Sequence, residues 1–143
     1  MNAKKIMKEI KVAVADKIKA DHALTEIKEV VRVERDGYWA ELEVECYWLF
    51  SGEEFVVVTN RYRAADNSSE RGKLSLSVVS TGDPVFKELT RNGVQDGEWR
   101  PLPKAYAVAG NALSASVYFH CVYDLVGAPD VVMEGVLTVE FPT

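Results

Sequence analysis

The stretch WAELEVECYWLF, residues 39–50, alternates charged and apolar residues, and this alternation constrains the fold more than any other feature of the chain. Glu41, Glu43 and Glu45 occupy every second position, with apolar residues between them. Successive side chains of a strand point to opposite faces of a sheet. The pattern therefore predicts a long strand with one polar and one apolar face.

Turn residues on both sides of this stretch predict its neighbours. Asp36-Gly37 precedes it, and this pair tolerates the positive φ angles that a two-residue hairpin turn requires. A three-residue turn at 51–53 would follow it. With these turns, opposite charges meet across the strands in four pairs, Lys28–Glu45, Arg32–Glu41, Glu41–Arg63 and Glu43–Arg61.

Each such cross-strand pair contributes roughly 0.2–1 kcal/mol. Because each glutamate stands beside a cation, we interpret the three as a charge ladder on a solvated sheet face. A catalytic carboxylate pair needs two unlike environments, and a metal site needs converging oxygens without cations among them. Neither pattern fits the glutamates.

The same register places Trp48 opposite Val56 on the other face. On the face of the glutamates it gathers four apolar residues near the second turn, Tyr47, Leu49, Phe55 and Val57. Something must cover this apolar end. Candidates are an apolar stripe near the N-terminus, the loop at 81–112, or a second subunit, so these four residues are a candidate oligomer contact.

The rest of the chain predicts an α+β domain. Ile6, Ile10, Val14 and Ile18 recur every fourth residue, which predicts an amphipathic helix over residues 3–20. Strands are predicted at 29–35, 38–50, 54–64, 73–80, 113–125 and 131–141. We expect one domain, residues 1–143, in which the helix packs on a mainly antiparallel sheet of these six strands that can curl into a half-barrel.

Residues 81–112 are predicted to form a long loop with a short helix, which Asp83-Pro84 begins and Gly93 ends. Long ordered loops are often functional. Four of its residues belong to types enriched at protein interfaces and are candidate partner-binding residues, Trp99, Arg100, Tyr106 and Arg91. The alternative is that the two aromatic residues only fasten the loop to the sheet.

Composition excludes several classes of partner. The net charge of −5 and the pI of about 5.1 disfavour nucleic acid, which needs a basic patch. No segment approaches the roughly 20 apolar residues of a membrane span, and no signal peptide is recognisable. We therefore expect a cytoplasmic protein or a part of an assembled particle. Cys46 and Cys121 are predicted to be buried free thiols, and no spacing predicts a metal or another cofactor.

Two functions remain. The first is a non-catalytic interaction or assembly protein, self-associating or bound to another protein, such as a small structural component of a phage or virion, or an inhibitor or immunity protein. The second is a small-ligand-binding protein or enzyme with a pocket between the helix and a curved sheet. Tyr118, His120 and Asp124 would then line the pocket. The absence of a local catalytic motif favours the first.

Overall fold

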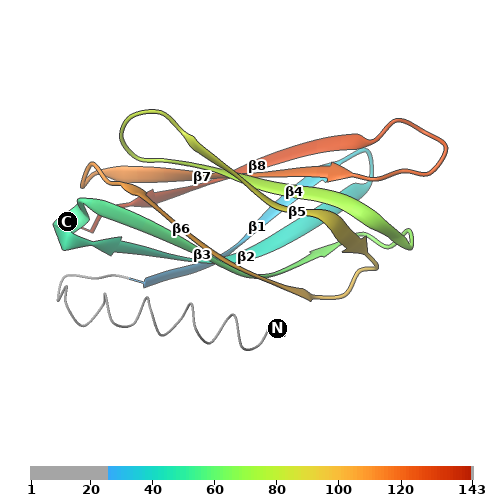
Figure 1. Cartoon of the computed structure of the whole chain (residues 1–143), viewed down its shortest axis with the longest axis horizontal. Coiled ribbons are helices and arrows are strands. Elements are labelled where there is room, and N and C mark those ends of the chain that lie inside the picture. Colours follow the sequence, from blue (N-terminus) through green and yellow to red (C-terminus); the bar gives the residue numbers. More distant parts are fainter. Residues whose placement is uncertain (1–25, 143) are drawn as a thin grey trace.

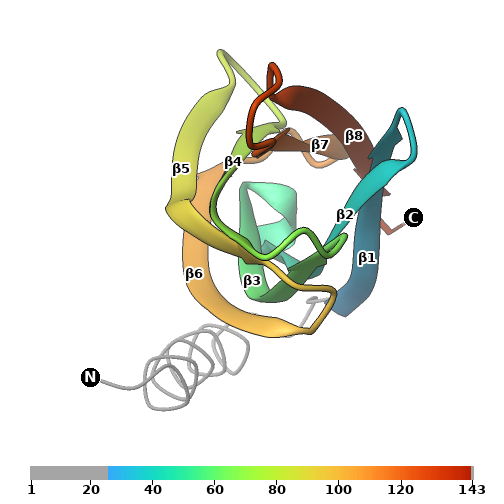
Figure 2. The same ribbon diagram turned by 90° about the vertical axis from the view of Figure 1, so that its right-hand side faces the viewer.

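The computed structural model describes residues 26–142, which form eight strands and one short 3-10 turn, η1 (Phe50–Gly52). The strands are β1 (Glu26–Arg35), β2 (Tyr38–Leu49), β3 (Glu54–Ala64), β4 (Ser69–Val79), β5 (Val85–Gln95), β6 (Arg100–Ala109), β7 (Ser114–Tyr123) and β8 (Val131–Glu140). They build two four-stranded antiparallel sheets, a first sheet in the order β1-β2-β3-β6 and a second in the order β5-β4-β7-β8. The sheets face each other as a sandwich (Figures 1 and 2).

The α+β class and the single sheet of six strands are therefore wrong for the described part of the chain, which is nearly all β. The helix expected at 3–20 lies outside the described residues. The short helix expected within 81–112 is wrong too, because β5 and β6 occupy that region. Three register shifts against β4 break the alternation of β5, and two prolines interrupt β6. These segments adopt strand conformation because they pair with β4 and β3, although their own sequences only weakly predict strands.

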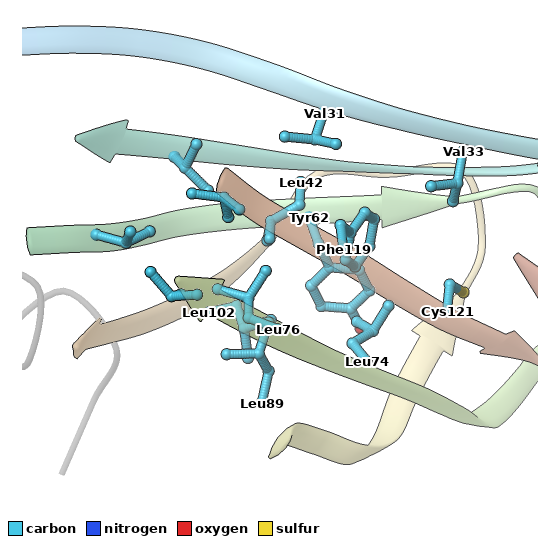
Figure 3. Close-up of a cluster of buried hydrophobic side chains, with 14 of the residues drawn as sticks. Val31, Val33, Leu42, Tyr62, Leu74, Leu76, Leu89, Leu102, Phe119 and Cys121 are labelled. Carbon is cyan, nitrogen blue, oxygen red and sulfur yellow. The ribbon is translucent and has the colours of Figure 1, made fainter. Parts of the chain in front are cut away.

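Alternate residues of the strands fill the space between the sheets. The burial of β7 follows this period, with Val117, Phe119 and Cys121 buried and the residues between them half-buried. Figure 3 shows side chains from both sheets meeting there, among them Leu42 from the first sheet and Leu76 from the second. The interior is thus a packed core.

The first hairpin has the predicted turn and register. Asp36 and Gly37 both have positive φ, 53° and 85°. All four predicted charge pairs lie opposite each other in the sheet, Lys28–Glu45, Arg32–Glu41, Glu41–Arg63 and Glu43–Arg61. Charge complementarity therefore predicted the register of three strands correctly near this turn.

Toward the other end of β2 the predicted register is wrong. It shifts by one residue between Glu43 and Val44, because Asn60 is an extra residue in β3. Trp48 consequently lies opposite Phe55 instead of Val56. A bulge of this kind exchanges the two faces of a strand beyond it.

Cys46 and Cys121 are free and buried, as predicted. Both thiols lie in the core, and burial raises the pKa of each to about 12. Thiolates are the reactive form of cysteine, so neither residue is a nucleophile at neutral pH.

One side of the sandwich is closed by direct contact between β1 and β8. An added Cβ at Gly135 would lie 2.9 Å from Val33 Cγ1 and 3.1 Å from Arg32 O. Arg35 Nη1 also donates a hydrogen bond to Val132 O at 3.2 Å. Glycine at 135 thus lets the edges of the two sheets meet.

We predict that Gly135→Ala lowers the free energy of unfolding by about 1–3 kcal/mol, because its methyl group must displace β1. Urea denaturation measures the change. Val136→Thr is the control, since Val136 is 54% exposed on the same strand and a surface change there should stay within about 0.5 kcal/mol. Equal effects of the two substitutions would contradict the contact.

Candidate functional site at an open sheet edge

The outer face of the first sheet carries the predicted ion pairs of Glu41 and Glu43. The expected solvated position is wrong for Glu45, which is buried and accepts a hydrogen bond from Tyr47 Oη at 3.3 Å. Arg63 Nε lies 2.6 Å from Glu41 Oε1, and Arg32 Nη1 lies 3.5 Å from Glu41 Oε2. Arg61 binds Glu43 through two nitrogens, at 3.2 and 3.3 Å. The carboxylates of Glu41 and Glu43 are thus both paired with arginines. This pairing accounts for the two glutamates as structural residues of the sheet.

Two tryptophans extend this ladder into a continuous network. The guanidinium of Arg63 lies 5.6 Å from the ring centre of Trp39 and 4.6 Å from that of Trp99. Arg61 also covers Trp99, at 4.3 Å, and Arg32 covers Trp39, at 4.8 Å. Such cation–π contacts fasten the segment before β6 onto the sheet. A flat ligand would have to displace arginines to stack on these rings.

The four candidate partner-binding residues do not form one surface. Trp99 lies in this network, and the neighbouring Arg100 is paired with Asp96. Arg91 lies on β5 in the second sheet and pairs with Glu88. Tyr106 is half-buried on β6, packs against the core, and has Lys87 Nζ 5.8 Å from its ring centre.

The candidate oligomer contact is not an exposed surface. Phe55 and Val57 are fully buried in the core, because the bulge at Asn60 turns them inward. Tyr47 and Leu49 are only 6% and 0% exposed. All four side chains are thus buried in the single chain.

The alternative pocket residues do not converge. Tyr118 and His120 lie on the outer face of the second sheet, since Phe119 and Cys121 point into the core. His120 Nδ1 lies 3.3 Å from Glu134 Oε2 there. Asp124 stands at the end of the sandwich, where Asn67 Nδ2 donates to its carbonyl oxygen at 2.7 Å.

Asp124 belongs to a polar network that joins the loops of that end. Gln95 Nε2 donates to Asp124 O at 3.0 Å, and Asp124 N donates to Gln95 Oε1 at 2.8 Å. Ser69 Oγ donates to the Asp124 carboxylate. An open cleft of about 420 Å³ adjoins the network, lined by Ser68, Ser69, Glu70, Arg71, Asp124, Leu125 and Val126. Within residues 26–142 no cluster of His, Cys, Asp and Glu could hold a metal ion.

The strongest candidate is the free edge of β6. Lys104 N donates to Thr59 Oγ1 at 3.0 Å and Gly110 N to Glu53 O at 2.7 Å, so both amides point toward β3. Backbone groups of a strand alternate in direction. The N–H and C=O groups of Ala105, Ala107 and Ala109 therefore point away from β3, toward the side on which β6 pairs with no other described strand.

Within residues 26–142, the second half of this edge has no proline or charged residue to protect it. Pro101 and Pro103 block pairing along the first half of β6, but the second half, residues 105–109, carries neither proline nor charge. The outward-facing residues Ala105, Ala107 and Ala109 are all exposed. Nothing in their side chains hinders the approach of another strand.

Sequence reasoning missed this edge because it assigned residues 81–112 to a loop. The signal was present in AYAVA, residues 105–109, whose small and large residues alternate. No protein family, curated protein or solved structure matches this chain. Among residues 26–142 no helix has the length and apolar character needed to cross a bilayer.

We predict that Arg63→Ala lowers the free energy of unfolding by about 1–3 kcal/mol, because the nearly buried Glu41 then keeps only its longer contact with Arg32. Urea denaturation and a double-mutant cycle with Glu41→Gln measure the coupling. Arg91→Ala is the control, as its pair with Glu88 is solvent-exposed and should contribute less than about 1 kcal/mol. A coupling near zero between residues 41 and 63 would contradict the network.

Proposed function

We propose that this protein is a non-catalytic binding and assembly protein that self-associates by strand pairing at β6. The observation that supports the proposal is the row of exposed residues Ala105, Ala107 and Ala109, whose backbone groups point away from β3. An open strand edge of this kind pairs readily with another chain. Addition of a strand to such an edge is a common mode of protein recognition.

A second copy of the chain fits this edge by symmetry. In an antiparallel pairing about a two-fold axis at Ala107, the residue faces its own counterpart, and Ala105 faces Ala109 of the other copy. All three residues direct their backbone groups outward, so each faces a residue of the other copy whose N–H and C=O point back toward it. A two-fold contact is the commonest form of self-association among proteins. The pairing would join the two first sheets into one.

Side chains on the inner flank of β6 also fit a second strand. In the symmetric pairing Tyr106 lies beside Val108 of the other copy, both on the core-facing side. Tyr106 is half-buried and Val108 is 9% exposed in the single chain. An added strand would complete their burial, which contributes roughly 25 cal/mol per Å² of apolar surface removed from water.

The ligand-binding or enzymatic alternative lacks such support. Its expected pocket residues lie on different surfaces of the sandwich, with Tyr118 and His120 on an outer face and Asp124 at one end. The described core is filled by side chains from both sheets.

We predict that Ala107→Pro abolishes self-association while the fold remains intact. Proline removes the outward N–H at the centre of the pairing, and the ladder between β6 and β3 does not use that N–H. Light scattering behind a sizing column should give twice the 15.9 kDa chain mass for the unchanged protein at high concentration and the single mass for the variant.

Ala107→Ser is the matched control, because serine keeps the backbone donor and is also small. It should associate like the unchanged chain, and circular dichroism should be the same for all three proteins. A monomer at every concentration for the unchanged chain would exclude self-association. A dimer that survives Ala107→Pro would place the interface elsewhere.

A further inference from the structure

The end of the sandwich opposite the Asp124 network is built from three connected turns, here called the apolar end. They are η1 (Phe50–Gly52), the β4–β5 turn at 80–84 and the β6–β7 turn at 110–113. Ser80 Oγ donates to Ser114 O at 2.8 Å, and Ala112 N donates to Gly52 O at 3.1 Å. Figure 1 shows these turns together at its left-hand side.

Of the five non-glycine residues with positive φ in the described part of the chain, three lie in this end. Phe50, Ser51 and Ala112 have φ angles of 52°, 56° and 57°, in the left-handed region that residues with a Cβ seldom adopt. Each such residue costs on the order of 1–3 kcal/mol. Asn-Gly would satisfy a turn with two successive left-handed residues far better than Phe-Ser. The chain thus has a phenylalanine at a position whose left-handed backbone conformation is unfavourable for that residue.

The strained turns expose apolar side chains. Phe50 is 47% exposed and Leu113 is 71% exposed. Beneath them, Trp48 Nε1 is buried without a hydrogen-bond partner among the described residues. Strain and an unsatisfied buried donor both reduce stability, so neither is explained by folding alone. Observed strain of this kind points to function.

Among residues 26–142, the charged side chains in the segments of the apolar end are all acidic. Glu53, Asp83 and Glu140 are exposed there. The three turns with their flanking residues, and the end of β8 beside them, contain no lysine or arginine, namely residues 49–54, 80–86, 110–115 and 138–142. The opposite end has arginines beside its turns, at positions 35, 71 and 100.

We infer that the apolar end binds a second, different protein, inserting Phe50 and Leu113 into an apolar depression rimmed by lysine or arginine. Aromatic side chains are enriched at the centres of interfaces, and complementary charge around them selects the partner. This interface goes beyond the proposed self-association, because it uses the turns at one end of the sandwich and leaves β6 untouched.

A peptide selection tests the chemistry of the partner. The immobilised full chain is exposed to a random displayed peptide library, and we expect enrichment of peptides that combine apolar residues with lysine or arginine. Phe50→Asn should weaken their binding by about tenfold or more. Val126→Asn is the control, because Val126 is 88% exposed at the opposite end and its replacement should leave binding unchanged.

Several outcomes of the selection would overturn the inference. Peptides that bind Phe50→Asn as strongly as the unchanged chain overturn the inference, as do enriched peptides without basic residues or the absence of enrichment. Peptides lost with Ala107→Pro and kept with Phe50→Asn would be β6 ligands, and they too count against the apolar end.

A stability measurement tests the strain independently of any ligand. Asparagine tolerates the left-handed conformation, so Phe50→Asn should raise the urea midpoint of unfolding. Loss of peptide binding together with a gain in stability is the result that the inference expects. A lower midpoint would show that Phe50 is kept for folding, and would overturn the inference.

Discussion

The β-bulge at Asn60 is the constraint on which the first sheet depends. Phe55 and Val57 must face the core together with Tyr62, although an unbroken two-residue alternation would place Tyr62 on the opposite face from them. The extra residue restores the phase, and the register against both β2 and β6 shifts at this point. One strand can therefore send apolar side chains inward along its whole length, with Arg61 on the outer face beside its glutamate partner.

The pairing of β6 with the same strand, β3, determines which backbone groups of β6 are left without a partner strand. Thr59 of β3 accepts a hydrogen bond from the Lys104 amide of β6. From Lys104 onward the backbone groups of β6 alternate in direction, so every second residue directs its N–H and C=O away from β3. The two sides of the sandwich consequently differ in character. At the β1–β8 side, Gly135 lets the sheets meet directly. The other side is formed by β5 and β6 (Figure 2). There the first half of β6 contains two prolines and residues 105–109 contain none, so the proposed self-association is assigned to the second half.

The sequence predicted the structure correctly where the pairing of opposite charges and the two-residue alternation of apolar residues indicated the same register. The Asp36-Gly37 turn, the four charge pairs and the buried thiols follow from patterns of a few neighbouring residues. It failed where the outcome depends on distant partners. No local signal places an extra residue at Asn60, and β5 and β6 acquire their strand conformation from pairing with β4 and β3. The edge at 105–109 was therefore missed, and the candidate contact at Phe55 and Val57 was assigned to the wrong face.

The most direct test of self-association at β6 is amide hydrogen exchange of residues 105–109, resolved by NMR at low and high protein concentration. The amides of Tyr106 and Val108 bond to β3 and should be protected at both concentrations. The amides of Ala105, Ala107 and Ala109 should exchange rapidly in dilute solution and become protected as the concentration rises. Rapid exchange of these three amides at every concentration would contradict the account.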